Sequence, residues 1–275
     1  MADGTFEPMS VGQILDGTFT LYRRNFVRFV AIVALIQVPI ALASLVARVA
    51  VGSWTAAGTE DVEAPLQAAF LLSIVLVSLV GLFLSVVGQS LCSAALMKSV
   101  SESYLGNEVT VGQAYGAVLP KLLTLIFAGI LVGLVVVAGM MVCVVPGVIF
   151  ALWFAVTTPA ILIENLGVAA GMGRSKWLTG GNLGKVFLVG LVAWLINVIA
   201  AGVITLPGTL AASVVARESW ALRQVIGEPF YLAAQVLTTP IGATASILLY
   251  YDLRIRKEGF DLEMLAKSLA SREAP

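Results

Sequence analysis

Residues 119–145, LPKLLTLIFAGILVGLVVVAGMMVCVV, decide the fold class. Lys121 is the only charged residue in this run. A hydrocarbon core about 30 Å thick is crossed by about 20 apolar residues of helix, so the run is long enough to span a membrane. Five other apolar runs of similar kind lie at residues 26–51, 66–100, 147–163, 185–216 and 229–253. The sequence therefore predicts an all-α fold, a polytopic transmembrane helical bundle of about six spans.

The composition supports a membrane protein. Hydrophobic residues make up 59% of the 275 positions and charged residues 12%, whereas soluble domains have roughly 45–50% and 25%. Basic and acidic residues number 16 each. The protein therefore has no net positive charge that would attract nucleic acid, and we expect no nucleic-acid partner.

The distribution of basic residues predicts the orientation. If both termini are cytoplasmic, 13 of the 16 Lys and Arg residues lie inside, and only Arg48, Arg217 and Arg223 lie outside. That asymmetry agrees with the positive-inside rule. We expect an acidic outer loop at residues 60–63.

Three segments of mixed polarity precede predicted hairpins, at residues 10–25, 110–119 and 167–182. The first two share Val-Gly-Gln, and the first and third match at three positions with an offset of 157. We interpret them as short cytoplasmic-side interfacial helices, each opening one of three repeated units; the alternative is chance similarity. The predicted divisions are an N-terminal interfacial segment (1–25), a six-span membrane domain (26–254) and a cytoplasmic amphipathic tail (255–275).

Prolines and small residues interrupt the apolar runs. Proline in a spanning helix indicates either a kink or a broken helix beside a substrate site; these prolines are Pro39, Pro159, Pro207 and Pro240. Small residues four apart predict close helix approach, at Gly129/Gly133, Gly81/Ser85 and Gly242/Ser246.

The residue types argue against an enzyme. The chain has no histidine, which excludes Ser-His-Asp and Cys-His arrangements and histidine-based zinc sites. It has no Gly-x-Ser-x-Gly elbow and no phosphate-cradling loop. We expect no catalytic site, no metal and no cofactor, and we expect Cys92 and Cys143 to remain unpaired.

Charged residues gather at the predicted inner boundary. This set contains Asp16, Arg23, Arg24, Glu164, Arg174, Lys176, Asp252, Arg254 and Arg256. An unpaired carboxylate at the end of an apolar helix is costly, so we expect Glu164 to pair with Arg174 or Lys176, and Asp252 with Arg23 or Arg24. The cluster either fixes the interfacial helices to the bundle or binds anionic lipid head groups, since guanidinium groups suit phosphate.

Uncharged polar residues lie within the predicted spans. They are Gln37, Gln89, Asn197, Gln235 and Thr238. Interhelical hydrogen bonds explain them; the alternative is a polar pathway through the membrane.

Three motifs carry a resemblance to a known family. They are residues 10–26 (SVGQILDGTFTLYRRNF), residues 159–180 (PAILIENLGVAAGMGRSKWLTG) and residues 250–262 (YYDLRIRKEGFDL). Together they resemble the bacterial membrane domain named after glycerophosphoryl diester phosphodiesterases, over nearly the whole chain. In those enzymes a separate soluble barrel with histidines and a metal performs hydrolysis, and this chain has no histidine.

The resemblance implies a bacterial multi-helix membrane domain and does not imply phosphodiesterase activity. Together with the distribution of basic residues, it leads us to expect a multi-pass protein of the bacterial cytoplasmic (inner) membrane with both termini cytoplasmic. The expected function is non-enzymatic: the domain engages membrane lipids, anionic ones in particular, or a membrane-protein partner. The alternative is a transporter or permease subunit for a small or lipidic solute.

Overall fold

The computed structural model describes residues 8–56, 64–216 and 219–258. Within those ranges the secondary structure is helical, with no strand. The predicted outer loop at residues 60–63 and residues 259–275 of the predicted tail lie outside the described residues. The all-α prediction is confirmed.

The helices follow one another with short connections. In chain order they are α1 (Val11–Arg24), α2 (Phe26–Ala56), α3 (Ala64–Tyr104), α4 (Val111–Val118), the 3₁₀ helix η1 (Leu119–Lys121), α5 (Leu122–Val142), α6 (Val144–Trp153), α7 (Thr157–Glu164), α8 (Val168–Thr179), α9 (Leu183–Val215) and α10 (Trp220–Glu258). Six helical stretches are long and apolar enough to cross a membrane, as predicted: Phe26–Gly52, Ala69–Tyr104, Val111–Val142, Val144–Glu164, Leu183–Val215 and Trp220–Glu258.

A short helix precedes each pair of apolar stretches, in the predicted order α1, α4 and α8. Ser10 caps α1 and Thr110 caps α4 in the same way, because each side chain accepts from a glutamine backbone N–H three residues on. Gln13 and Gln113 bond back to the cap residues and complete two capping boxes. The shared Val-Gly-Gln motif is thus part of a helix start.

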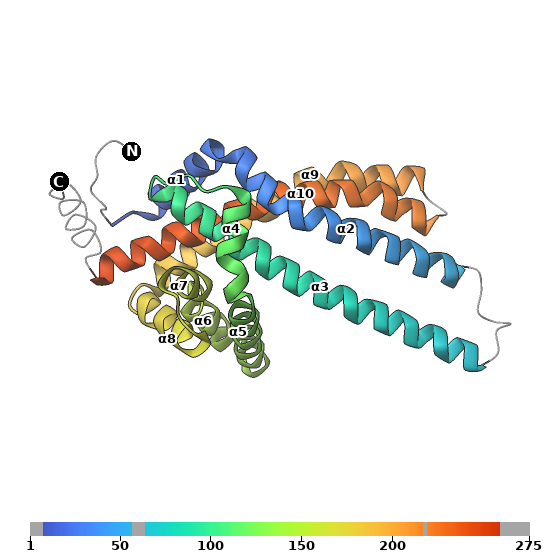
Figure 1. Cartoon of the computed structure of the whole chain (residues 1–275), viewed down its shortest axis with the longest axis horizontal. Coiled ribbons are helices and arrows are strands. Elements are labelled where there is room, and N and C mark those ends of the chain that lie inside the picture. Colours follow the sequence, from blue (N-terminus) through green and yellow to red (C-terminus); the bar gives the residue numbers. More distant parts are fainter. Residues whose placement is uncertain (1–7, 57–63, 217–218, 259–275) are drawn as a thin grey trace.

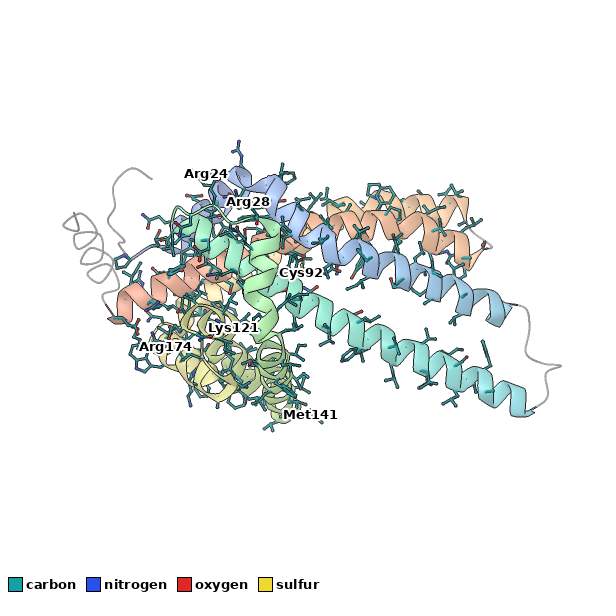
Figure 2. All side chains as sticks on the ribbon, viewed as in Figure 1. Arg24, Arg28, Cys92, Lys121, Met141 and Arg174 are labelled. Atoms are coloured by element: carbon teal, nitrogen blue, oxygen red, sulfur yellow. The ribbon has the colours of Figure 1, made fainter. Side chains whose placement is uncertain are left out.

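The C-terminal half of α10 is the centre of the packed core. It lies against α9, α2, α1 and α3, and Figure 1 shows it passing between them. Ile247, Leu248, Tyr250 and Leu253 are each at most 1% exposed. We call the end of the molecule that holds α1, α4, α8 and the last turns of α10 the charged end, because Arg24, Arg28, Lys121 and Arg174 all lie there (Figure 2).

The opposite end is open. α3 diverges from α2 toward its outer end (Figure 1), and a cavity of about 380 Å³ lies between them, lined by Ala43, Ala47, Val77 and Gly81 among others. Large side chains on all sides of outer α3, such as Leu71, Val75 and Phe83, are more than half exposed. Apolar surface of this extent suits contact with lipid rather than water.

The fourth predicted span, residues 147–163, is not one continuous helix. It is divided into α6 and α7 by a turn at residues 154–156. Pro159 falls in the first turn of α7, where its missing N–H needs no intrahelical partner. Ser175 of α8 accepts from the Val156 N–H (3.2 Å) and donates to the Trp153 carbonyl (2.8 Å), so α8 satisfies backbone groups that the break releases.

The other three prolines, Pro39, Pro207 and Pro240, lie inside continuous helices. The small-residue prediction was wrong for Gly81, Gly129 and Gly133, because an added Cβ would meet nothing within 4 Å at any of them. Close approach occurs at other glycines instead. At Gly139 of α5 and Gly147 of α6, an added Cβ would meet the backbone of the other helix.

Candidate functional site

A network of four charged residues joins α7, α8 and α10 at the charged end. Arg174 Nε donates to both Glu164 oxygens (2.9 and 2.8 Å), which confirms one predicted pairing. Arg174 also pairs with Glu258, and Arg254 Nε bonds Glu258 (2.9 Å). The Tyr250 hydroxyl donates to Glu164 (2.6 Å). Burial lowers the pKa of Arg174, but its bonds to Glu164 and Glu258 outweigh that effect and raise it, so the guanidinium stays charged.

A second network surrounds Asp252, which is fully buried. Its carboxylate pairs with Lys185 of α9, accepts from Arg256 Nε (3.0 Å) and accepts from the Met9 backbone N–H (2.7 Å). Lys185 and Arg256 also donate to the Met9 carbonyl. This network holds the segment before α1 against α9 and α10.

The predicted pairing of Asp252 with Arg23 or Arg24 was therefore wrong. Asp252 binds the chain just before α1 begins, whereas the two arginines lie in the last turn of α1. A 14-residue helix is about 21 Å long at 1.5 Å per residue. The length of α1 separates the arginines from the carboxylate.

Arg23, Arg24 and Arg28 instead line a separate open cavity of about 820 Å³, between the α1–α2 corner and the start of α4. We call it the arginine groove; its remaining lining residues are Asn25, Phe26, Val27, Ala31, Glu108, Val109, Thr110, Val111 and Gln113. Arg23 and Arg24 are exposed and Arg28 is half-buried. Figure 2 shows Arg24 and Arg28 together at that corner.

The neighbouring residues explain why these arginines face outward. The Tyr22 hydroxyl donates to the Leu237 carbonyl (2.9 Å), which fixes α1 against α10. Asn25 caps the end of α1, since its side chain and its backbone N–H both donate to the Leu21 carbonyl. Phe26 then begins α2, so the chain turns at this point and presents Arg23, Arg24 and Arg28 at one corner.

These three arginines differ from every other described cation. Within residues 8–56, 64–216 and 219–258, each remaining Lys and Arg has an acid, a carbonyl or an aromatic ring as partner: Arg48, Lys98, Lys121, Arg174, Lys176, Lys185, Arg223, Arg254, Arg256 and Lys257. In the same part of the chain no hydrogen bond or ion pair engages the side chains of Arg23, Arg24 or Arg28, and none joins Glu108 to them.

The predicted cluster thus separates into three parts. Glu164, Arg174 and Arg254 belong to the first network, Asp252 and Arg256 to the second, and Arg23 and Arg24 to the groove. Two members stand apart: Lys176 lies 4.4 Å over the Trp153 ring, and Asp16 is exposed on α1. The sequence-based cluster omitted Arg28, Lys185 and Glu258, although Arg28 and Lys185 both lie where an apolar run meets a charged segment.

The uncharged polar residues form separate pairs instead of one pathway. Gln37 donates to Gln89 (2.8 Å) between α2 and α3, and Asn197 donates to the Thr238 carbonyl (3.0 Å) between α9 and α10. Gln235 contacts Tyr231 within its own helix (3.4 Å). A cavity of about 440 Å³ between α6, α9 and α10 includes Asn197 in a largely apolar lining, without Gln235 or Thr238.

One further ion pair was absent from the predicted sites. Arg48 of α2 donates to Glu228 of α10 (2.6 Å), and Glu228 is only 8% exposed. The sequence signal was an acidic residue directly before Pro229 at the start of an apolar run. No group of three or more Cys, Asp or Glu that could hold a metal occurs in the part of the chain that the structure describes.

The chain is similar to a distant relative among known proteins. A UPF0259 membrane protein of Pectobacterium carotovorum subsp. carotovorum is 30% identical over 123 residues, which is 45% of this chain and 49% of that protein. The match thus spans about half the length of the curated relative. No family model matches the chain, and no solved structure matches it. The likeness and the six apolar helical stretches identify an integral membrane protein.

Proposed function

We propose that this membrane protein binds anionic lipid head groups in the arginine groove, and that it does so without catalysing a reaction. The observation that carries the proposal is that Arg23, Arg24 and Arg28 line one cavity and have no protein partner among the described residues. Guanidinium groups form paired, charge-assisted hydrogen bonds with phosphate oxygens. A phosphate group would supply the missing acceptors.

The position of the groove supports a lipid as the source of that phosphate. Arg28 lies in the first turn of α2, where the long apolar stretch Phe26–Gly52 begins. Basic side chains at this boundary lie at the level of lipid head groups. Phe26 and Val27, which also line the groove, are 41% and 79% exposed and could contact the acyl chains.

The remaining parts of the proposal follow the sequence. The excess of basic residues at the charged end supports a cytoplasmic location for that end and for both termini, in a bacterial inner membrane. The motifs at residues 10–26, 159–180 and 250–262 support kinship with the membrane domain named after glycerophosphoryl diester phosphodiesterases. A membrane-protein partner is compatible with the same groove through its own acidic side chains.

A transporter is less well supported. It would need a continuous route, whereas Gln37/Gln89 and Asn197/Thr238 form hydrogen-bonded pairs on different helices. The cavity beside Asn197 has a mostly apolar lining, which suits a hydrocarbon chain better than a polar solute.

The test is native mass spectrometry of the purified protein with phosphatidylglycerol and with phosphatidylcholine. The R23Q/R24Q/R28Q variant should lose the retained phosphatidylglycerol, because it removes the unpaired charges and no ion pair. K176Q/K257Q is the matched control, since it removes two charges at the same end outside the groove. Equal retention of phosphatidylglycerol by the wild type and the groove variant would refute the proposal.

A further inference from the structure

The tip of the α5–α6 hairpin is the most exposed apolar surface that joins two helices in the described chain. Met141, Val142, Val144 and Val145 are 84%, 82%, 65% and 63% exposed. Cys143, in an extended conformation, is the single residue between the two helices. From residue 122 to residue 154 the sequence has no charged residue. A connection in water between two spans is normally polar, so this tip is suited to hydrocarbon instead.

The hairpin is tightly closed directly beneath the tip. A Cβ on Gly139 would lie 3.0 Å from Gly147 Cα, and one on Gly147 would lie 2.8 Å from the Met140 backbone nitrogen. The two helices therefore touch backbone to backbone. The described structure leaves no polar loop that could extend from the tip into water.

The returning helix is short and ends at the charged end. The returning stretch Val144–Glu164 is long enough to cross a membrane, but it bends at residues 154–156. Before that bend, α6 has 10 residues, about 15 Å of helix, which is half of a hydrocarbon core of about 30 Å. At its last residue, the Trp153 carbonyl accepts from Ser175 of α8, and the Trp153 ring lies 4.4 Å beneath the Lys176 ammonium. The end of α6 is thus held beside Lys176, at the level of the charged side chains.

The outgoing helix begins at the same end. Lys121, just before α5, donates to the Leu162 carbonyl near the end of α7 (2.9 Å). The start of the outgoing helix therefore contacts the end of the returning stretch. α5 has 21 residues and could cross the core only if it ran along the membrane normal. Figure 1 shows α5 and α6 nearly end-on while α2, α3 and α10 lie along the page, so the hairpin lies across the long helices.

From these observations we infer that α5 and α6 form a re-entrant hairpin, which enters the membrane from the charged end and returns to it with its tip, Met140–Val145, embedded among the acyl chains of that leaflet. Four helices, α2, α3, α9 and α10, then cross the membrane. The hairpin is an interaction surface whose partner is lipid hydrocarbon. This inference does not depend on the arginine groove.

Cys143 makes the inference testable in the native chain. It is exposed on the protein surface, whereas the second cysteine, Cys92, is fully buried. In C92A, a membrane-impermeant maleimide should fail to label Cys143 in intact cells and in inverted vesicles, and should label it after denaturation in SDS. Residues 215 and 108 lie at opposite ends of the molecule. V215C and E108C, each made in the C92A/C143A background, therefore report labelling from the two aqueous faces.

Labelling of Cys143 from the same face as V215C would show that the hairpin crosses the membrane, and labelling from the same face as E108C would show that the tip lies in water at the charged end. Either result overturns the inference. A nitroxide on Cys143 gives a positive readout: it should collide with dissolved oxygen and be shielded from a water-soluble nickel chelate. If C92A does not fold, the wild-type chain serves for the labelling without SDS and for the nitroxide, because Cys92 is buried in the folded protein.

Discussion

Replacing Asp252 by Ala should destabilise the charged end more than replacing any exposed acidic residue by Ala. The Asp252 carboxylate is 0% exposed and is shared by Lys185, Arg256 and the Met9 backbone N–H. Lys185 is itself only 13% exposed and would lose its carboxylate partner. Removing one partner of a buried ion pair costs about 3–5 kcal/mol, because the other charge remains without compensation.

That free energy corresponds to a loss of at least about 100-fold in the ratio of folded to unfolded protein. The assay is reversible unfolding of the purified protein in mixed micelles as the SDS fraction rises. D16A is the matched control, since Asp16 is exposed on α1. D252A/K185M should recover much of the loss, because it removes the stranded ammonium group. If D252A unfolds at the same SDS fraction as D16A, the carboxylate does not hold the segments together.

Three other substitutions and one control test the packing in the same assay. G147A should destabilise by about 1–3 kcal/mol through a backbone clash, whereas G133A, which faces open space, should have no measurable effect; equal behaviour would contradict the tight hairpin. Q89L should lower the free energy of unfolding by about 0.6–1.7 kcal/mol, because it removes the interhelical hydrogen bond to Gln37. An unchanged free energy would show that this bond is absent in the micelle. S175A should lower the free energy of unfolding by about 1–3 kcal/mol, because the Val156 N–H loses its acceptor while Thr179 still donates to the Trp153 carbonyl; an unchanged transition would show that water satisfies that N–H.

Hydropathy predicted the fold because the membrane imposes a length on each helix. The six apolar stretches follow from that rule. The pairing of Glu164 with Arg174 was also predictable. The two residues are close in sequence, and a carboxylate at the end of an apolar helix requires a cation.

Helix packing was not predictable to the same degree, because the spanning helices are apolar on all sides. A soluble helix shows its buried face by its polar residues on the other side, but nothing in α5 distinguishes Gly133, which faces open space, from Gly139, which contacts Gly147. The partner of Asp252 depended on how α9 and the segment before α1 are arranged around α10. That arrangement is tertiary and leaves no local sequence pattern.

Acidic side chains pair with the cations of the two networks but not with the arginines of the groove. This difference explains why the arginine groove is the better candidate site. Glu164, Glu258 and Asp252 each engage two cationic side chains, so the two networks need no ligand to compensate their charges. Arg23, Arg24 and Arg28 share one groove without an ion pair to an acidic residue, so a bound anion would reduce the repulsion among their like charges. An anion that binds the folded state alone adds to its stability by mass action. If the proposed function holds, the ion-pair networks stabilise the fold in any membrane, whereas the contribution of the groove depends on the anionic lipid that surrounds it.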